Sequence, residues 1–332
     1  MSDKITISLL IYNGAGYLPF CLTSLFSQSD QNWELVILDN GSNDNSGVVA
    51  AEICGRRENV KILPPESKNI GFAAGHNKII KTCRSEFILL LNQDIILEPD
   101  YISKLREFME NNPRIGASAG KILRWNFKYA PKLTNAGKTD IIDTAGLRPS
   151  RAFKIIDIGA GDKDNGQYDD IKEVFGVSGC LPLYRVNALA AAEYLDERFF
   201  SYKEDVDLAF RLQAAGWRAF CVGGAVAYHD RSIFGSEAAG ELGVISRRQS
   251  RSDFANYFSY RNQLFLLIKN LAAVDFVHYG VFIFWYELKK FFYILLFEQR
   301  SLSAWLEVFK QWPQLLNERK KIKPKSVRKW IK

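Results

Sequence analysis

Short apolar runs alternate with segments of helical spacing over the first hundred residues. Each run holds four to seven residues between polar clusters, which is typical of strands buried on both faces of a parallel sheet. Single helices between such strands favour right-handed crossovers and a mostly parallel sheet, so the predicted fold class is α/β. The predicted strands cover residues 5–11, 33–38, 60–63 and 87–91, and the predicted helices cover 17–27, 46–54 and 71–83.

Polar residues follow the carboxyl ends of these predicted strands. Tyr12 and Asn13 follow the first strand, Asp39 ends the second, and Asn92 and Asp94 follow the fourth. Because open α/β sheets bind ligands at the carboxyl ends of their strands, we expect these side chains to line one crevice. A carboxylate on a short connection, such as Asp94, suits a hard cation that bridges phosphates. The alternative is a loop aspartate that only caps a turn.

The second half of the chain is less regular. Residues 126–172 are rich in Gly, Asp, Asn and Lys. A polar insertion of this length is either a functional lid or a disordered segment. Short strands are possible at 139–143 and 153–158, further strand material lies at 174–183, 217–222 and 225–228, just before His229, and a helix is predicted at 204–215.

Two acids, Glu204 and Asp205, open the predicted helix at 204–215. Acids in a first helical turn are common. A carboxylate within hydrogen-bond reach of a hydroxyl can also take its proton, and a helix N-terminus keeps such a carboxylate ionised. Asp207 and Arg211 lie four residues apart on one helix face, so we expect them to form an ion pair.

Residues 253–332 differ from the α/β pattern and form a second region in this interpretation, after a first region at 1–252. Helices are predicted at 254–271, 274–297 and 301–317, and the middle one is densely aromatic. Glu287, Lys289 and Lys290 interrupt it, and each charge at a bilayer centre costs about 2.5–3.5 kcal/mol on insertion scales. We therefore expect helices that lie on a membrane or pack on the domain, and not a membrane span.

Composition and charge narrow the class of protein. The 332 residues are 47% hydrophobic, which suits a globular protein with a full core. Five widely spaced cysteines without a CxxC pair favour reduced thiols over a disulfide framework or zinc site. The N-terminus runs directly into a strand pattern, so no signal peptide is expected. Residues 319–332 carry eight Lys or Arg and no acid, while the whole chain has a net charge of +7. This basic tail predicts an anionic membrane surface as a partner, more than a nucleic acid.

The ordered motifs of the chain resemble those of family 2 glycosyltransferases, and within that family the rhamnosyltransferase-like branch of bacterial polysaccharide assembly. The resemblance covers roughly residues 4–235 and rests on the order and spacing of several motifs together. It implies a GT-A fold, a nucleotide-diphosphate sugar donor, a divalent metal and inversion at the anomeric carbon. The matching motifs lie at 5–13, 36–44, 69–77, 90–94, 164–169, 173–176, 199–217 and His229.

The resemblance implies a donor-binding site built from several of these motifs. A carboxylate at Asp39 can accept the N3–H of uracil or thymine, which cytosine lacks, although an Asx turn is the structural alternative. Gly71 lets the backbone approach a ligand closely, and the helix that follows presents its N-terminal amides to a phosphate. The donor-binding residues implied in this way are Tyr12, Asn13, Asp39, Asn69, Gly71, Asn77 and Asn92.

The metal and the base follow from the same resemblance. Asn92 stands where the family has the first acid of an Asp-any-Asp motif, so a metal would be held mainly by Asp94. His229 is the imidazole candidate, with a purely structural histidine as the alternative. Oxygen ligands with one imidazole suit Mg²⁺ or Mn²⁺. The catalytic pair implied is Asp205, as the base, with Glu204 beside it.

The sequence therefore predicts an inverting, metal-dependent glycosyltransferase, peripheral on the cytoplasmic face of the cell membrane. We expect it to move rhamnose from a dTDP donor to a lipid-linked or polysaccharide acceptor, with another UDP- or dTDP-sugar as the alternative donor. A sugar-1-phosphate nucleotidyltransferase would need an Arg in the Gly-rich loop after the first strand, and residues 12–16 have none. A membrane-bound nucleotide-sugar sensor, with Asn92 marking lost catalysis, is a further alternative.

Overall fold

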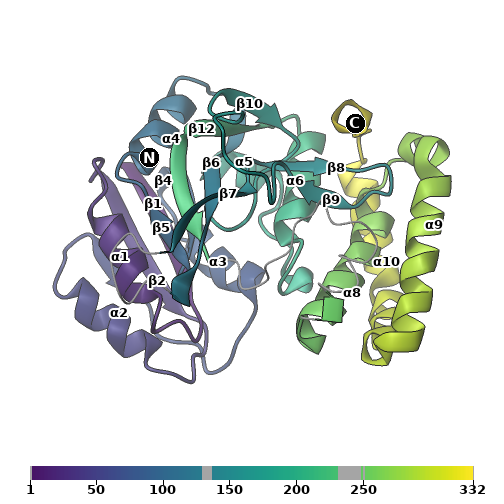
Figure 1. Cartoon of the computed structure of the whole chain (residues 1–332), viewed down its shortest axis with the longest axis horizontal. Coiled ribbons are helices and arrows are strands. Elements are labelled where there is room, and N and C mark those ends of the chain that lie inside the picture. The colour runs from purple at the N-terminus through teal and green to yellow at the C-terminus, as the bar shows by residue number, and fades with distance from the viewer. Residues whose placement is uncertain (1, 129–136, 231–247, 250, 332) are drawn as a thin grey trace.

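A twisted sheet with helices on both faces forms the larger part of the molecule, and a group of C-terminal helices stands beside it (Figure 1). The computed structural model describes residues 2–128, 137–230, 248–249 and 251–331. The helices are α1 (Leu18–Phe26), α2 (Ser46–Cys54), α3 (Phe72–Ile80), α4 (Tyr101–Glu110), α5 (Val186–Ala191), α6 (Glu204–Ala214), α8 (Asp253–Asn270), α9 (Ala273–Phe297) and α10 (Ala304–Ile322).

The central sheet has the strand order β10-β12-β6-β11-β4-β1-β2-β3, with β5 on β12 and β7 on β6. Strands β1 to β4 pair in parallel, as do β6 and β12, whereas β11 joins β4 to β6 in antiparallel fashion. A separate ribbon pairs β8 with β9. The strands are β1 (Ser2–Ile11), β2 (Trp33–Asp39), β3 (Val60–Ile62), β4 (Ser85–Asn92), β5 (Ile95–Leu97), β6 (Ile115–Trp125), β7 (Lys138–Thr144), β8 (Leu147–Pro149), β9 (Ile155–Asp157), β10 (Ile171–Val174), β11 (Leu183–Arg185) and β12 (Arg218–His229).

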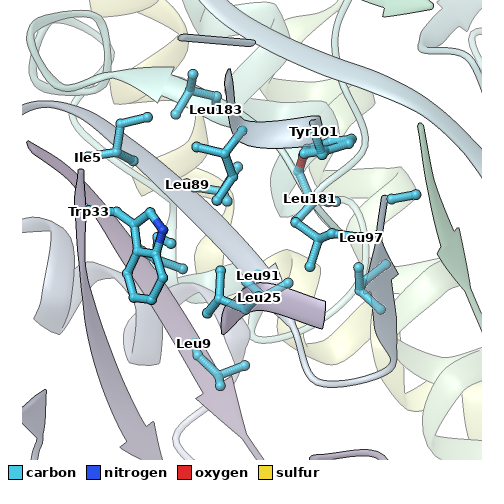
Figure 2. Packing of buried hydrophobic residues seen from close by; sticks show 14 of the residues in the cluster. Ile5, Leu9, Leu25, Trp33, Leu89, Leu91, Leu97, Tyr101, Leu181 and Leu183 are labelled. Carbon is cyan, nitrogen blue, oxygen red and sulfur yellow. The ribbon is translucent and has the colours of Figure 1, made fainter. Parts of the chain in front are cut away.

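The period of two along each strand divides the core between the two faces of the sheet. Leu9 and Leu91 point to the face covered by α1, α2 and α4, where they pack with Leu25 and Tyr101 (Figure 2). Leu90 points to the opposite face, which α3, α5 and α6 cover. Both faces of the inner strands are therefore buried, which explains the continuous apolar runs, and each fully buried leucine stabilises the fold by about 1.5–3 kcal/mol.

The predicted α/β class is confirmed, and the differences from the expected elements are local. The segment after Asp94 is a short strand, β5, because all three of its residues are buried against β12. The apolar stretch at 174–183 is not one strand, since β10 ends at Val174 and β11 begins at Leu183. The two stretches at 217–222 and 225–228 form the single strand β12, with a register shift between Val222 and Val226.

Part of the polar insertion at 126–172 lies outside the described residues. Its second half is fixed to the sheet by Lys121 of β6, which is 4% exposed and pairs with Asp164 at 2.6 Å and Asp169 at 2.5 Å. Both acids belong to the 164–169 motif, so this motif has a structural role in attaching the loop.

The C-terminal helices share a hydrophobic cluster with the sheet domain. Phe199 and Phe210 pack with Phe265 of α8, Ile294 of α9 and Val308 of α10 in one buried group. The division into regions 1–252 and 253–332 remains a prediction, and a common core joins the two regions. Among the helices formed by the described residues, none combines the length and the apolar character needed to cross a membrane. The five cysteines all lie in the described part of the chain, and none of them forms a disulfide.

Candidate functional site

The carboxyl ends of β1, β2 and β4 lie level with one another. Ile11 is in register with Asp39, and Leu10 is in register with Asn92. The side chain of Gln93 joins the turn after β4 to the turn after β1, because its amide accepts from the N–H of Tyr12 and donates to the C=O of Tyr12, both at 2.9 Å. The sheet therefore brings Tyr12, Asp39 and Asn92 to one edge.

The turns after β1 and β2 are fastened to each other. Asn13 has a positive φ of 48° and its side chain accepts from the N–H of Asn43 at 2.7 Å. The hydroxyl of Ser42 accepts from the N–H of Asn13 at 3.1 Å, while one oxygen of Asp39 accepts from the N–H of Ser42 at 2.9 Å. Asp39 thus has the turn-capping role weighed as an alternative, through one of its two carboxylate oxygens.

The predicted donor-binding residues at 69–77 lie in two different environments: Asn69 and Gly71 are in the loop before α3, and Asn77 is buried within α3. Asn69 accepts from the N–H of Gly71 at 2.8 Å, and Gly71 has a φ of 91° that favours glycine. A Cβ on Gly71 would also lie 2.7 Å from the carbonyl oxygen of Phe200. Asn77 is 2% exposed, and its amide bonds to Leu195 and Glu197. Asn77 is therefore buried between α3 and the segment at 195–197, which it joins.

Asp94 and His229 lie side by side because Asp94 immediately precedes β5, whose first residue, Ile95, pairs with His229 of β12. Nε2 of His229 is 3.5 Å from Oδ2 of Asp94, and Nδ1 of His229 lies 2.9 Å from Oδ2 of Asp143. Burial acts to lower the pKa of His229, but the Asp94 and Asp143 carboxylates together raise this pKa well above its ordinary value. Asp143 itself is 1% exposed, at the base of this arrangement.

The Asp94–His229 pair offers a divalent metal two protein ligands, provided that the metal displaces the Nε2 proton of His229. Asp143 engages Nδ1 of His229, which leaves Nε2 directed toward Asp94, and metal-binding histidines commonly have such a carboxylate partner. Within the described ranges, no group of three or more His, Cys, Asp or Glu side chains is placed to hold a metal. Mg²⁺ is often held by one or two carboxylates together with substrate phosphates, so a metal here would depend on the diphosphate for its other ligands.

Asp205 is connected to the end of β4 by hydrogen bonds through the backbone of two intervening residues, Gly179 and Cys180. Oδ2 of Asp205 accepts from the N–H of Gly179 at 2.8 Å. The next residue, Cys180, accepts through its C=O from the N–H of Asn92 at 3.0 Å. The predicted base and the turn that carries Asp94 are therefore attached to the same short segment, although 113 positions separate Asn92 from Asp205 in the chain.

Glu204 lies beside Asp205 but in a different environment. Its side chain is 7% exposed, and burial, with a smaller contribution from the Asp205 charge, raises the pKa of Glu204 to about 8. A carboxyl group with such a pKa is mostly neutral at pH 7. The predicted ion pair of Asp207 and Arg211 is confirmed at 2.7 Å, inside the core.

Sequence reasoning did not identify Gln93, Asp143 or the partners of the turn before α6. A signal for Asp143 was present, because it ends a predicted strand, as Asp39 does. Gln93 stands between two residues that were selected. The residues of α8 that contact the turn at 199–203 lie about 60 positions away in sequence, where no local pattern connects them.

The chain is similar in sequence to known glycosyltransferases. Residues 6–160 match the model of glycosyl transferase family 2. The chain is 32% identical over 105 residues to glycosyltransferase GlyG of Streptococcus pneumoniae serotype 4, which covers 32% of this chain and 35% of GlyG. It is 25% identical over 263 residues to an N-acetylglucosaminyl-diphospho-decaprenol L-rhamnosyltransferase of Mycobacterium tuberculosis H37Rv, which covers 73% of this chain and 81% of that protein.

The fold has solved counterparts. GalNAc-T7, crystallised with UDP, GalNAc and Mn²⁺, superposes with a TM-score of 0.65 at 13% identity, over 98% of this chain and 55% of that chain. The fold is thus GT-A. In sequence, residues 6–160, slightly less than half of the chain, are similar to glycosyl transferase family 2. The chain spans less than half the length of the first three curated relatives it matches.

Proposed function

We propose that this protein is an inverting, metal-dependent glycosyltransferase that transfers a sugar from a nucleotide-diphosphate donor. The observation that carries the proposal is the attachment of Asp205 and Asn92 to the same segment, through Gly179 and Cys180. This attachment holds a carboxylate near the strand ends where an α/β sheet binds its ligand. In this proposal Tyr12, Asn13, Asp39, Asn69, Gly71 and Asn92 surround the donor, while Asn77 supports α3.

The reaction needs one proton acceptor and a stabilised leaving group. The acceptor hydroxyl attacks the anomeric carbon, its proton passes to the Asp205 carboxylate, and the carbon–oxygen bond to the diphosphate breaks with its electron pair on the diphosphate. A Mg²⁺ or Mn²⁺ ion held by Asp94 and His229 would offset the charge on the diphosphate when bound. A neutral Glu204 would leave Asp205 as the carboxylate of the pair that accepts the proton.

The donor and acceptor are proposed from the longest of these alignments. The mycobacterial relative, which is aligned over most of both chains, is named as a rhamnosyltransferase that acts on a diphospho-decaprenol. We therefore assign dTDP-rhamnose as the donor and a lipid-linked glycan as the acceptor, with another dTDP- or UDP-linked sugar as the alternative. The product would belong to cell-wall or other polysaccharide assembly.

The proposed location is the inner face of the cell membrane, with residues 253–332 on an anionic surface. Large apolar side chains of α9 and α10 are exposed, which is unusual for a protein surface without a partner. Of the three charges that interrupt α9, Glu287 and Lys290 are half-buried, and Lys289 is exposed. The most exposed of these apolar residues are Val277, Val281, Leu296, Phe297, Leu306 and Phe309.

The test combines binding with turnover. Nucleotide sugars are screened by thermal shift with Mn²⁺, and the donors that stabilise the protein are then assayed for metal-dependent transfer to a lipid-linked acceptor. We expect a dTDP-sugar to give both the largest shift and turnover. Stabilisation without turnover in any donor–acceptor pair would favour the nucleotide-sugar sensor, for which the neutral Asn92 is the motivating residue. Absence of both would refute the proposal.

A further inference from the structure

We propose that Arg261 and Asn262 of α8 are positioning residues for Asp205, acting through the turn at residues 199–203. The proposal rests on the function proposed above and extends it to residues outside the family 2 domain. It makes α8 part of the catalytic unit rather than a separate appendage. The supporting observations are the conformation of the turn at 199–203 and the hydrogen bonds that Arg261 and Asn262 make to it.

The turn at 199–203 has an unfavourable backbone. The N–H of Ser201 donates to the C=O of Phe199 at 2.6 Å, and Phe200 between them has φ 60° and ψ −64°. This is a γ-turn of the rarer, strained form. Tyr202 and Lys203 also have positive φ angles, both 69°. Such conformations persist only where the surroundings enforce them. Lys203 immediately precedes Glu204, the first residue of α6. The turn therefore sets the position of the N-terminus of α6, where Asp205 lies.

Asn262 supplies hydrogen bonds that hold the turn. Its Nδ2 lies 2.9, 2.9 and 2.6 Å from the carbonyl oxygens of Phe199, Ser201 and Tyr202, respectively. The side chain is fully buried, at 0% exposure. One amide group therefore contacts three carbonyl oxygens of a five-residue turn. Because the side chain is buried, water cannot take over these hydrogen bonds if the amide is removed.

Arg261 fixes the orientation of that amide and adds its own contacts. Its Nε and Nη2 donate to Oδ1 of Asn262 at 3.0 and 2.8 Å. Because a guanidinium only donates, Oδ1 of Asn262 must face Arg261, and Nδ2 must face the turn. Nη2 of Arg261 also reaches the carbonyl oxygens of Arg198 at 2.5 Å and Phe199 at 3.0 Å.

The other side of the turn touches the donor loop. The C=O of Phe200 accepts from the N–H of Phe72, the first residue of α3, at 2.6 Å. Gly71 is packed against the same carbonyl group. The turn thus lies between the predicted donor loop and the base, and α8 holds it from behind. A loosened turn would move Asp205 relative to the donor, while residues at the ends of β1, β2 and β4 would still bind the nucleotide.

The experiment compares two buried asparagines of α8 in the full-length enzyme. Asn262→Leu removes the contacts to the turn. Asn256→Leu is the matched control, because Asn256 is 4% exposed and its amide donates to the C=O of Arg248, away from the turn. We measure kcat, donor KM, thermal stability and hydrogen exchange of residues 199–207, all at a temperature where each variant is folded.

We expect Asn262→Leu to lower kcat by about 10- to 100-fold, the loss typical of a misplaced catalytic group, with little change in donor KM. Exchange in residues 199–205 should rise. Asn256→Leu should lose stability but keep kcat. A wild-type kcat in folded Asn262→Leu, or equal losses in both variants, overturns the proposal. If Asn262→Leu does not fold, Arg261→Lys is judged by the same criteria, since one ammonium cannot reproduce the several contacts of the guanidinium.

Asp205→Asn separates this proposal from the function on which it rests. If Asp205→Asn retains turnover, the assignment of the base itself is refuted. If Asp205→Asn is inactive but Asn262→Leu is as active as the wild type, the base assignment stands and only the positioning role is refuted.

Discussion

The N–H of Gly179 donates a hydrogen bond to Oδ2 of Asp205 at 2.8 Å. Gly179 also leaves room for this carboxylate, because a Cβ in its place would lie only 3.2 Å from Cβ of Asp205. The adjacent Cys180 pairs with Asn92 at the end of β4. The carboxylate of the proposed base is therefore tied to the sheet edge through the backbone of Gly179 and Cys180.

The first prediction concerns Asp205. Asp205→Asn keeps the shape of the side chain but removes its capacity to accept a proton. We expect donor binding, measured by calorimetry, to be retained, and turnover to fall by about 10²–10⁴-fold, the usual contribution of general-base catalysis. Near-normal turnover in this variant would remove Asp205 from the role of base.

The second prediction concerns the metal. Asp94→Ala removes the carboxylate that contacts His229, so metal-dependent donor binding should be abolished. Asn92→Asp adds a negative oxygen to the same turn and should tighten Mn²⁺ binding or leave it unchanged. Both effects are measured by titrating Mn²⁺ in the presence of the nucleotide diphosphate. Metal-dependent donor binding that survives in Asp94→Ala would contradict the arrangement.

The third prediction concerns the base of the nucleotide. Asp39 uses one carboxylate oxygen for the N–H of Ser42, and the proposal assigns its other oxygen to the N3–H of uracil or thymine. Calorimetry should therefore detect binding of dTDP or UDP and little binding of CDP. Asp39→Asn should reduce this discrimination, because an amide can also donate. Equal affinities of the wild-type protein for all three nucleotides would exclude Asp39 from the base site.

The fourth prediction concerns Glu204 and pH. The pKa of Glu204 is raised to about 8 by burial, so between about pH 4.5 and 8 the unfolded chain loses this proton while the folded chain keeps it. The group's contribution to stability is thus complete below about pH 4.5 and declines as pH rises, by at most about 1.4 kcal/mol per pH unit. Glu204→Gln should remove this decline and keep most of the turnover.

Urea unfolding at several pH values between about 5 and 8 measures this effect. The free energy of unfolding of Glu204→Gln should fall less with rising pH than that of the wild type. Glu52→Gln, at an exposed position of α2, is the control and should follow the wild type. Parallel curves for the wild type and Glu204→Gln would show that Glu204 is already ionised in the folded protein.

The sheet edge could be predicted from sequence, because buried parallel strands leave a clear pattern of apolar runs and polar ends. This pattern placed Asp39, Asn92 and Asp94 together, and it placed His229 after a strand. The contact between Asp205 and Gly179 could not be predicted in this way. It depends on β11, a three-residue strand that runs antiparallel to its neighbours and carries no periodic signal.

The C-terminal helices show the same limit. Their existence and approximate bounds can be predicted from helical spacing. Which charged side chains of each helix become buried depends on tertiary packing, which the spacing does not show. Glu287 and Lys290 interrupt the apolar run of α9 in sequence, yet Nζ of Lys290 lies 4.8 Å from the ring centroid of Tyr260 in α8. Two of the three interrupting charges are therefore half-buried, and the exposed side of α9 is more apolar than the sequence suggests.

The fifth prediction concerns the membrane. Deleting residues 319–332 is a poor test, because Val327 is buried and its N–H donates to Asp275 of α9. Neutralising exposed lysines leaves this packing intact. Each such lysine contributes about 1 kcal/mol near an anionic surface, so the fourfold variant should bind anionic liposomes much more weakly at low salt. The lysines replaced by glutamine are Lys320, Lys321, Lys323 and Lys325.

Liposome flotation at low and high salt separates the two parts of the binding. The electrostatic part should fade as salt shortens the Debye length, whereas the part from buried apolar area should persist. Phe284→Ser with Trp285→Ser should remove the persistent part, since both residues are more than half exposed on α9, and Val48→Ser on α2 should not. Neutralising Arg56, Lys61, Arg84 and Lys163 controls for net charge. If the wild-type protein ignores anionic liposomes at low salt, the exposed apolar surface of α9 serves another partner.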